Sequence, residues 1–131
     1  MHQDIRWKQR FQNFEKAYLF LKRATERTEL DDLQAAGLIQ SFEFTFELTW
    51  KTLKDYLELM GVPLSFPREV IKHAFQTNLI ENGQLWLEML EHRNELTHTY
   101  DEIQTKTAVA KIRDLYFSAL KQVYETMKNV P

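Results

Sequence analysis

The segment from Arg93 to Tyr100 carries the side chains of this chain that are best suited to chemistry on a phosphate group. It contains a guanidinium, a carboxamide, an imidazole and a phenol, on Arg93, Asn94, His98 and Tyr100 respectively. A guanidinium keeps its positive charge and binds phosphate oxygens strongly, whereas an imidazole gains and loses a proton near neutral pH. Together these groups can hold a phosphate and move a proton beside it.

A helix is predicted to position Arg93, because this residue follows the strongly helical run from Leu85 to His92. At about 100° per residue, Arg93 falls in the middle of an apolar face, one turn after Met89 and Leu90. A buried guanidinium needs a partner for its charge. Arg93 therefore either pairs with a carboxylate or lies where this face opens onto a cleft or a second subunit.

The spacing within the segment sets a condition on any shared site. Asn94 and His98 are four residues apart, which makes them neighbours on a helix surface. Arg93 and His98 lie about 140° apart on an ideal helix, so they meet at one ligand only if the helix ends or distorts near Thr97, or through the reach of the Arg side chain. The stretch 99–101 fits such an ending, because Thr and Asp favour caps and turns. An Arg and a His at a helix end also form structural pairs, so the spacing by itself leaves the chemistry open.

The apolar pattern predicts an all-α protein, an antiparallel up-and-down bundle of four main helices and one short helix. The expected helices span residues 4–26, 32–60, 66–77, 84–98 and 103–128, and the helix 66–77 is the short one. Asp31 is the expected N-cap of the longest helix, Gly61 marks its end, and Pro67 begins the short helix. In the last helix the expected apolar stripe is Ala108, Ile112, Leu115, Tyr116, Ala119, Val123 and Met127.

The longest helix carries a second apolar feature beside its core stripe. That stripe is expected to be Ala35, Ile39, Phe42, Phe46, Trp50, Leu53, Leu57 and Met60. On the opposite side, Phe44 projects among Glu43, Glu47 and Lys51, and Leu48 lies beside it. Exposed apolar groups of this kind favour an interface with a partner. A helix that is packed on two sides inside its own bundle explains them equally well.

Length and composition favour a single domain, residues 1–131, in the cytoplasm. The chain has no cysteine, which excludes disulfides, thiolate metal sites and cysteine nucleophiles. A formal charge of −2 gives no overall support for nucleic-acid binding, so we expect no DNA partner, and any RNA contact has to be local. No apolar run approaches the length of a membrane span and the N-terminus does not resemble a signal peptide, so we expect no membrane partner. The histidines lack metal-ligand spacing, so we also expect no metal and no cofactor.

Several segments of the chain resemble one superfamily. The pattern Arg-Asn-x-x-x-His-x-Tyr, formed by Arg93, Asn94, His98 and Tyr100, is similar to the signature of the HEPN superfamily. The segments 42–51, 67–72 and 86–90 add a closer resemblance to HepT-like proteins and nucleotidyltransferase substrate-binding proteins. The resemblance covers most of the chain, and it implies the same helical bundle.

The HEPN resemblance implies a metal-independent endoribonuclease that acts as a homodimer, with two copies of the motif in one cleft. RNA supplies its own nucleophile, the 2′-hydroxyl. His98 would act as general base, general acid or both across the two subunits, and Arg93 would neutralise the charge that develops on the phosphorane. Asn94 would orient the phosphate or His98.

The HepT-like resemblance implies a partner as well. Such proteins are typically encoded beside a minimal nucleotidyltransferase and form a toxin–antitoxin pair with it. The partner can adenylylate the Tyr of the motif, which is Tyr100 here. The added bulk and negative charge next to Arg93 would block the cleft.

The alternative is a non-catalytic substrate-binding subunit of a two-chain nucleotidyltransferase. Arg93 and His98 would then hold a substrate or shape the subunit interface, and no RNA would be cut. The negative net charge favours this alternative, whereas the intact Arg-Asn-x-x-x-His-x-Tyr pattern favours the nuclease. A third interpretation, a structural dimer without a ligand, leaves Arg93 unexplained.

Overall fold

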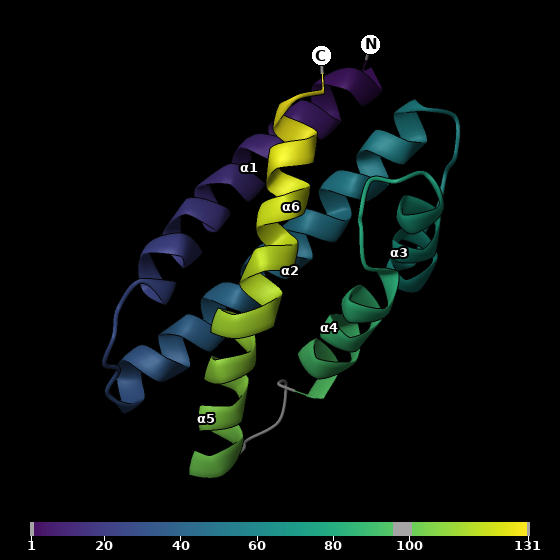
Figure 1. The fold of residues 1–131 in the computed structure, drawn as a ribbon. Coiled ribbons are helices and arrows are strands. Elements are labelled where there is room, and N and C mark those ends of the chain that lie inside the picture. Colours follow the sequence, from purple (N-terminus) through teal and green to yellow (C-terminus); the bar gives the residue numbers. More distant parts are fainter. Residues whose placement is uncertain (1, 96–100, 131) are drawn as a thin grey trace.

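The structure, a computed structural model, describes residues 2–95 and 101–130 and shows the predicted antiparallel helical bundle (Figure 1). The helices are α1 (His2–Thr25), α2 (Asp32–Leu59), α3 (Pro67–Gln76), α4 (Gly83–Glu95), α5 (Glu102–Lys111) and α6 (Phe117–Lys128). A π-helical turn, η1 (Ile112–Tyr116), joins α5 to α6 into one long C-terminal element. The fold prediction is confirmed, with α3 as the short helix, and no strand occurs in the described ranges.

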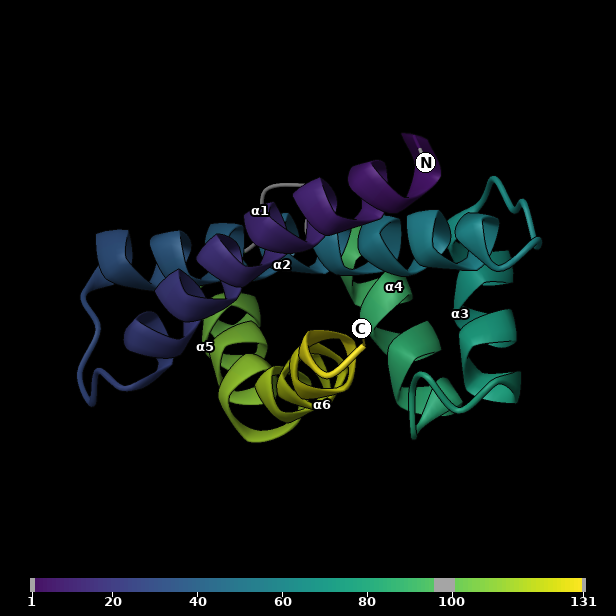
Figure 2. The same cartoon turned by 90° about the horizontal axis from the view of Figure 1, so that it is seen from above.

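Helix α2 is the centre of the bundle. It contacts α1 along its length, and it also contacts α3, α5 and α6. Figure 2 shows α1 and α2 lying side by side as one layer, with α3 to α6 packed against one face of that layer. Nearly the whole predicted stripe of α2 is buried, from Ala35 to Leu57. Met60 is an exception, with 56% of its surface exposed, because it follows the last helical residue.

The helix ends follow from local sequence. Asp31 caps α2 as predicted, since its side chain accepts from the Gln34 backbone N–H at 2.7 Å and Gln34 Oε1 accepts from the Asp31 N–H at 3.0 Å. Gly61 follows the end of α2 with φ +93°, a conformation that favours glycine. Asp101 caps α5 through the same reciprocal pair with Gln104.

The C-terminal element departs from the predicted stripe because of its π turn. A π turn inserts an extra residue into the helical repeat, so the side chains that follow it rotate relative to a regular helix. Leu115, expected in the core, is 45% exposed, while Leu120 is fully buried. Tyr116, in the same turn, is fully buried.

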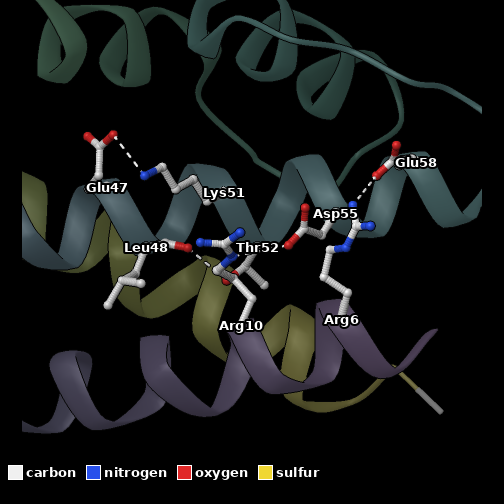
Figure 3. A network of polar contacts seen from close by, with 8 residues as sticks. All are labelled: Arg6, Arg10, Glu47, Leu48, Lys51, Thr52, Asp55 and Glu58. Atoms are coloured by element: carbon white, nitrogen blue, oxygen red, sulfur yellow. Dashed lines mark hydrogen bonds and ion pairs between the residues drawn. The ribbon is translucent and has the colours of Figure 1, made fainter. Parts of the chain in front are cut away.

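Two ion pairs fasten the N-terminal half of α1 to the C-terminal half of α2 (Figure 3). Arg10 Nε lies 3.1 Å from Asp55 Oδ2, and the Asp55 side chain is only 2% exposed. Arg6 Nη1 lies 3.1 Å from Glu58 Oε2 near the surface. A buried carboxylate needs such a cation, and Arg10 supplies it from α1.

In the part of the chain that the structure describes, no helix is both long enough and apolar enough to cross a membrane.

Candidate functional site

Arg93 lies on the last turn of α4 and reaches across to α2. Its Nη2 is 3.2 Å from Glu47 Oε2, and 24% of its side chain is exposed. The guanidinium also lies over the ring of Phe46, 5.9 Å from the ring centre, within the range of a cation–π contact. The charge of Arg93 is thus met by a carboxylate, which was the first of the two alternatives predicted from the sequence.

The carboxylate of Glu47 forms ion pairs with two cations. Arg93 contacts its Oε2, whereas Lys51 Nζ lies 3.7 Å from its Oε1. Figure 3 shows Glu47 and Lys51 on one side of α2, with Leu48 projecting from another side of the same helix. Glu47 and Lys51 are four residues apart, which is the spacing at which opposite charges pair on a helix surface. Glu47 lies opposite the buried stripe of α2, as the sequence indicates, and 34% of its side chain is exposed beside Arg93 of α4.

A second carboxylate, Glu43, lies one turn before Glu47 on α2. It is half-buried, and this burial raises its pKa above the ordinary value for a glutamate, while the nearby Arg93 charge opposes the rise. Arg93 therefore influences two carboxylates on one helix. Sequence reasoning missed both as members of the site, although the charges lie four residues apart on α2.

Of the remaining motif residues, the structure describes Asn94. Asn94 lies on α4 directly after Arg93, and its side chain is exposed at the end of the helix. His98 and Tyr100 lie outside the described residues. That they join Arg93 and Asn94 in one site stays a prediction from the sequence.

His92, next to Arg93, forms a contact that no sequence pattern indicated. Its Nδ1 is 3.1 Å from the hydroxyl of Tyr116, which belongs to the π turn. Burial lowers the pKa of His92, helped by the charge of Lys111, so the imidazole is neutral at pH 7. Burial also raises the pKa of Tyr116 to about 12, so its hydroxyl keeps its proton.

The end of α4 is thus tied to three other elements. Glu88 contacts Lys111 of α5 at 3.3 Å, His92 contacts Tyr116 of η1, and Arg93 contacts Glu47 of α2. Glu88 lies one turn before His92 and Arg93, which are adjacent, and the three contacts lead to different neighbours. Together they set the position and rotation of the helix end from which the rest of the motif departs.

Phe44 and Leu48, the predicted interface residues, line a groove between α1 and α2. Phe44 is 61% exposed and Leu48 is half-buried. The groove has a volume of about 820 Å³ and its walls include Ala17, Phe20 and Leu38. A binding role for these residues stays a prediction.

No group of three or more His, Asp or Glu side chains suited to hold a metal ion occurs within residues 2–95 and 101–130.

Comparison with known proteins gives consistent matches. A family model described as "Nucleotidyltransferase substrate binding protein like" matches residues 9–129. The chain is 30% identical over 91 residues to a Haemophilus influenzae protein named "Probable ribonuclease HepT". That match covers 65% of this chain and 62% of the relative, so it spans less than two thirds of the relative's length.

Two solved structures share the fold. One, from Thermus thermophilus, has a TM-score of 0.81 and 30% identity, and the match covers 88% of this chain and 99% of that one. The other is a Haemophilus influenzae protein described as having the fold of a substrate binding domain of a nucleotidyltransferase. It has a TM-score of 0.79 and 22% identity, and the match covers 91% of this chain and 99% of that one.

Proposed function

This chain belongs to the family described as "Nucleotidyltransferase substrate binding protein like", and we propose that it is the HEPN subunit of a two-gene system with a minimal nucleotidyltransferase. In this system the chain is a metal-independent endoribonuclease toxin that acts as a homodimer in the cytoplasm. The partner nucleotidyltransferase controls it. The similarity to a relative named as a ribonuclease supports this function.

The observation that carries the proposal is the placement of Arg93. A permanent cation is held in one orientation by Glu47 and Phe46, and 24% of its side chain is still exposed. The ion pair with Glu47 is made through Nη2, and a guanidinium has further N–H donors beside that one. A cation that is fixed before substrate arrives stabilises developing negative charge without reorganisation.

The reaction uses groups of the motif and of the RNA. His98 takes the proton of the 2′-hydroxyl, whose oxygen attacks the adjacent phosphorus. Arg93 stabilises the charge on the phosphorane, and Asn94 orients the phosphate. The bond to the 5′-oxygen then breaks, and this oxygen receives a proton from His98 of the second copy. The products are a 2′,3′-cyclic phosphate and a 5′-hydroxyl end.

Control by the partner acts on the same site. Adenylylation of Tyr100 places a phosphodiester and a nucleoside two residues after His98. The added negative charge and bulk compete with RNA for Arg93. Phe44 and Leu48 are the proposed contact residues for a second copy or for the partner.

A second candidate function has its own support. The family description and the net charge of −2 favour a substrate-binding subunit of a two-chain nucleotidyltransferase. In that case Arg93 holds an anionic substrate, and catalysis belongs to the other chain.

RNA cleavage by the purified chain in EDTA separates the two functions. The parent protein is compared with His98→Ala, Arg93→Ala and, as a matched control, Arg68→Ala on the exposed side of α3. The nuclease function predicts cleavage by the parent and by Arg68→Ala, and a loss of about 100-fold or more in the other two variants. Cleavage by all four proteins indicates a contaminant. Cleavage by none, on tRNA and mRNA alike, leaves the substrate-binding subunit as the function.

A further inference from the structure

Arg93 does not stand alone in the site, because its partner Glu47 is itself held from two sides. Arg93 occupies one carboxylate oxygen and Lys51 lies near the other. Glu47 is about one third exposed, with 34% of its side chain accessible, so it is neither free in solvent nor enclosed. A carboxylate with a cation at each oxygen has little freedom to turn, and the orientation of Arg93 follows from it.

Phe46 provides a second contact that restrains the guanidinium of Arg93. The ring lies on the residue before Glu47, and the guanidinium rests over it at 5.9 Å. The Nε of Arg93 is buried, and no acceptor among the described residues binds it. Such a buried, unpaired donor is unfavourable, so the position of Arg93 depends on the contacts that it does make.

The local charge also decides how strongly an anion binds at Arg93. Two carboxylates, Glu43 and Glu47, face two cations, Arg93 and Lys51, so the group is close to neutral overall. An anion at Arg93 feels the attraction of the guanidinium and the repulsion of Glu47 beside it. The residue that orients Arg93 therefore also weakens the binding of the anion.

We propose that Glu47 is the positioning residue for Arg93, and that the pair of Glu47 and Lys51 sets the affinity of this site for a phosphate. This inference rests on the proposed role of Arg93 as the phosphate-binding group. Glu47 does not touch the substrate. It holds the guanidinium where the phosphorane charge develops. Because its own negative charge repels the phosphate, it also makes substrate binding weaker.

Opposite effects on binding and turnover distinguish this role from a structural one. Glu47→Gln keeps the size of the side chain but removes its charge. It is expected to tighten phosphate binding about threefold to tenfold, because the repulsion is gone, and to lower kcat for RNA cleavage about tenfold, because Arg93 is no longer held. A loss of folding lowers both quantities together, and thermal melting of each variant identifies that case.

Variants outside and inside the pair supply the controls. Glu29→Gln removes an exposed carboxylate from the segment between α1 and α2, away from Arg93. It is expected to leave kcat within about twofold of the parent. Lys51→Met removes the second cation from Glu47, so phosphate binding is expected to weaken. Tighter phosphate binding by Lys51→Met contradicts the proposal that Arg93 and Lys51 share the carboxylate of Glu47.

The experiment is NMR of protein labelled with ¹⁵N-arginine, titrated with inorganic phosphate, together with RNA cleavage by the same variants. Loss of one Nε–Hε signal in Arg93→Lys assigns Arg93. If Glu47→Gln leaves both this signal and the phosphate affinity unchanged, the role of Glu47 is overturned, whatever the cleavage results are. If the signal and the affinity respond as expected but no protein cleaves RNA, the positioning role holds and the nuclease function fails.

Discussion

At the scale of single residues, the contacts of Arg93 and His92 determine the orientation and the charge of each side chain. Arg93 is held by Glu47 and Phe46, while its neighbour His92 turns to Tyr116 and becomes neutral through burial. Adjacent residues of one helix thus provide a fixed cation and an uncharged anchor. Arg93 keeps its charge at this helix end, whereas His92 adds an uncharged contact to the π turn.

The lowered pKa of His92 predicts a pH dependence of stability. The unfolded state binds a proton near pH 6.5, whereas the folded state binds it only at lower pH. Between these two pKa values the unfolded chain carries more protons, so stability falls as the pH drops through this window and is fully present above it. His92→Gln is expected to remove part of this slope. Urea unfolding of parent and variant between about pH 7 and pH 5 measures the difference, and identical slopes contradict the prediction.

At the scale of elements, glycines in α2 and directly after it act in opposite ways. Gly37 lies inside α2 on the wall of the α1–α2 groove, and an added Cβ there meets nothing within 4 Å. Gly61 follows the helix at φ +93°, where a Cβ is strained. One glycine is thus a weak point of a helix, and the other is required to end it.

The same substitution is expected to have opposite effects at these glycines. Gly37→Ala should raise the free energy of unfolding by about 0.5–1 kcal/mol, because alanine favours the helix and finds open space. Gly61→Ala should lower it by about 1 kcal/mol, because alanine is strained at positive φ. Urea denaturation of both variants measures the two changes. A stabilised Gly61→Ala protein is incompatible with the observed helix end.

At the scale of the whole molecule, the layer formed by α1 and α2 has one covered and one open side. Helices α5 and α6 pack on the covered side, and the groove with Phe44 and Leu48 is lined by residues of α1, of α2 and of the segment between them. Charges that face α4 and apolar groups that face the groove are therefore on adjacent sides of α2. A protein seated in the groove lies close to the elements that hold Arg93.

Association of the chain tests the interface prediction. If the proposed homodimer forms through the groove, Phe44→Glu is expected to shift it to monomer, because it places a charge among apolar groups. Leu33→Glu is the matched control, since Leu33 is 82% exposed and is not part of the groove wall. Light scattering after size-exclusion chromatography reports the mass. Equal dimerisation of both variants removes Phe44 from the interface.

The helices, their order and the candidate motif could all be predicted from the amino-acid sequence. Apolar spacing is a local property, and it identified the stripe of α2 and the cap at Asp31, because side-chain period and capping act within a few residues. The same reasoning placed Arg93 on an apolar face and required a partner for it. The single-domain prediction and the roles of His98 and Tyr100 stay predictions.

Contacts between side chains on different helices could not be predicted from the sequence and follow from the packing of the bundle. The pairing of Arg93 with Glu47 joins residues on different helices, and no spacing rule connects positions so far apart in sequence. The π turn that buries Tyr116 beside His92 and exposes Leu115 interrupts the regular period on which the sequence prediction relied. Local periodicity sets which face of a helix is apolar, but packing between helices selects the partner of a charge on that face.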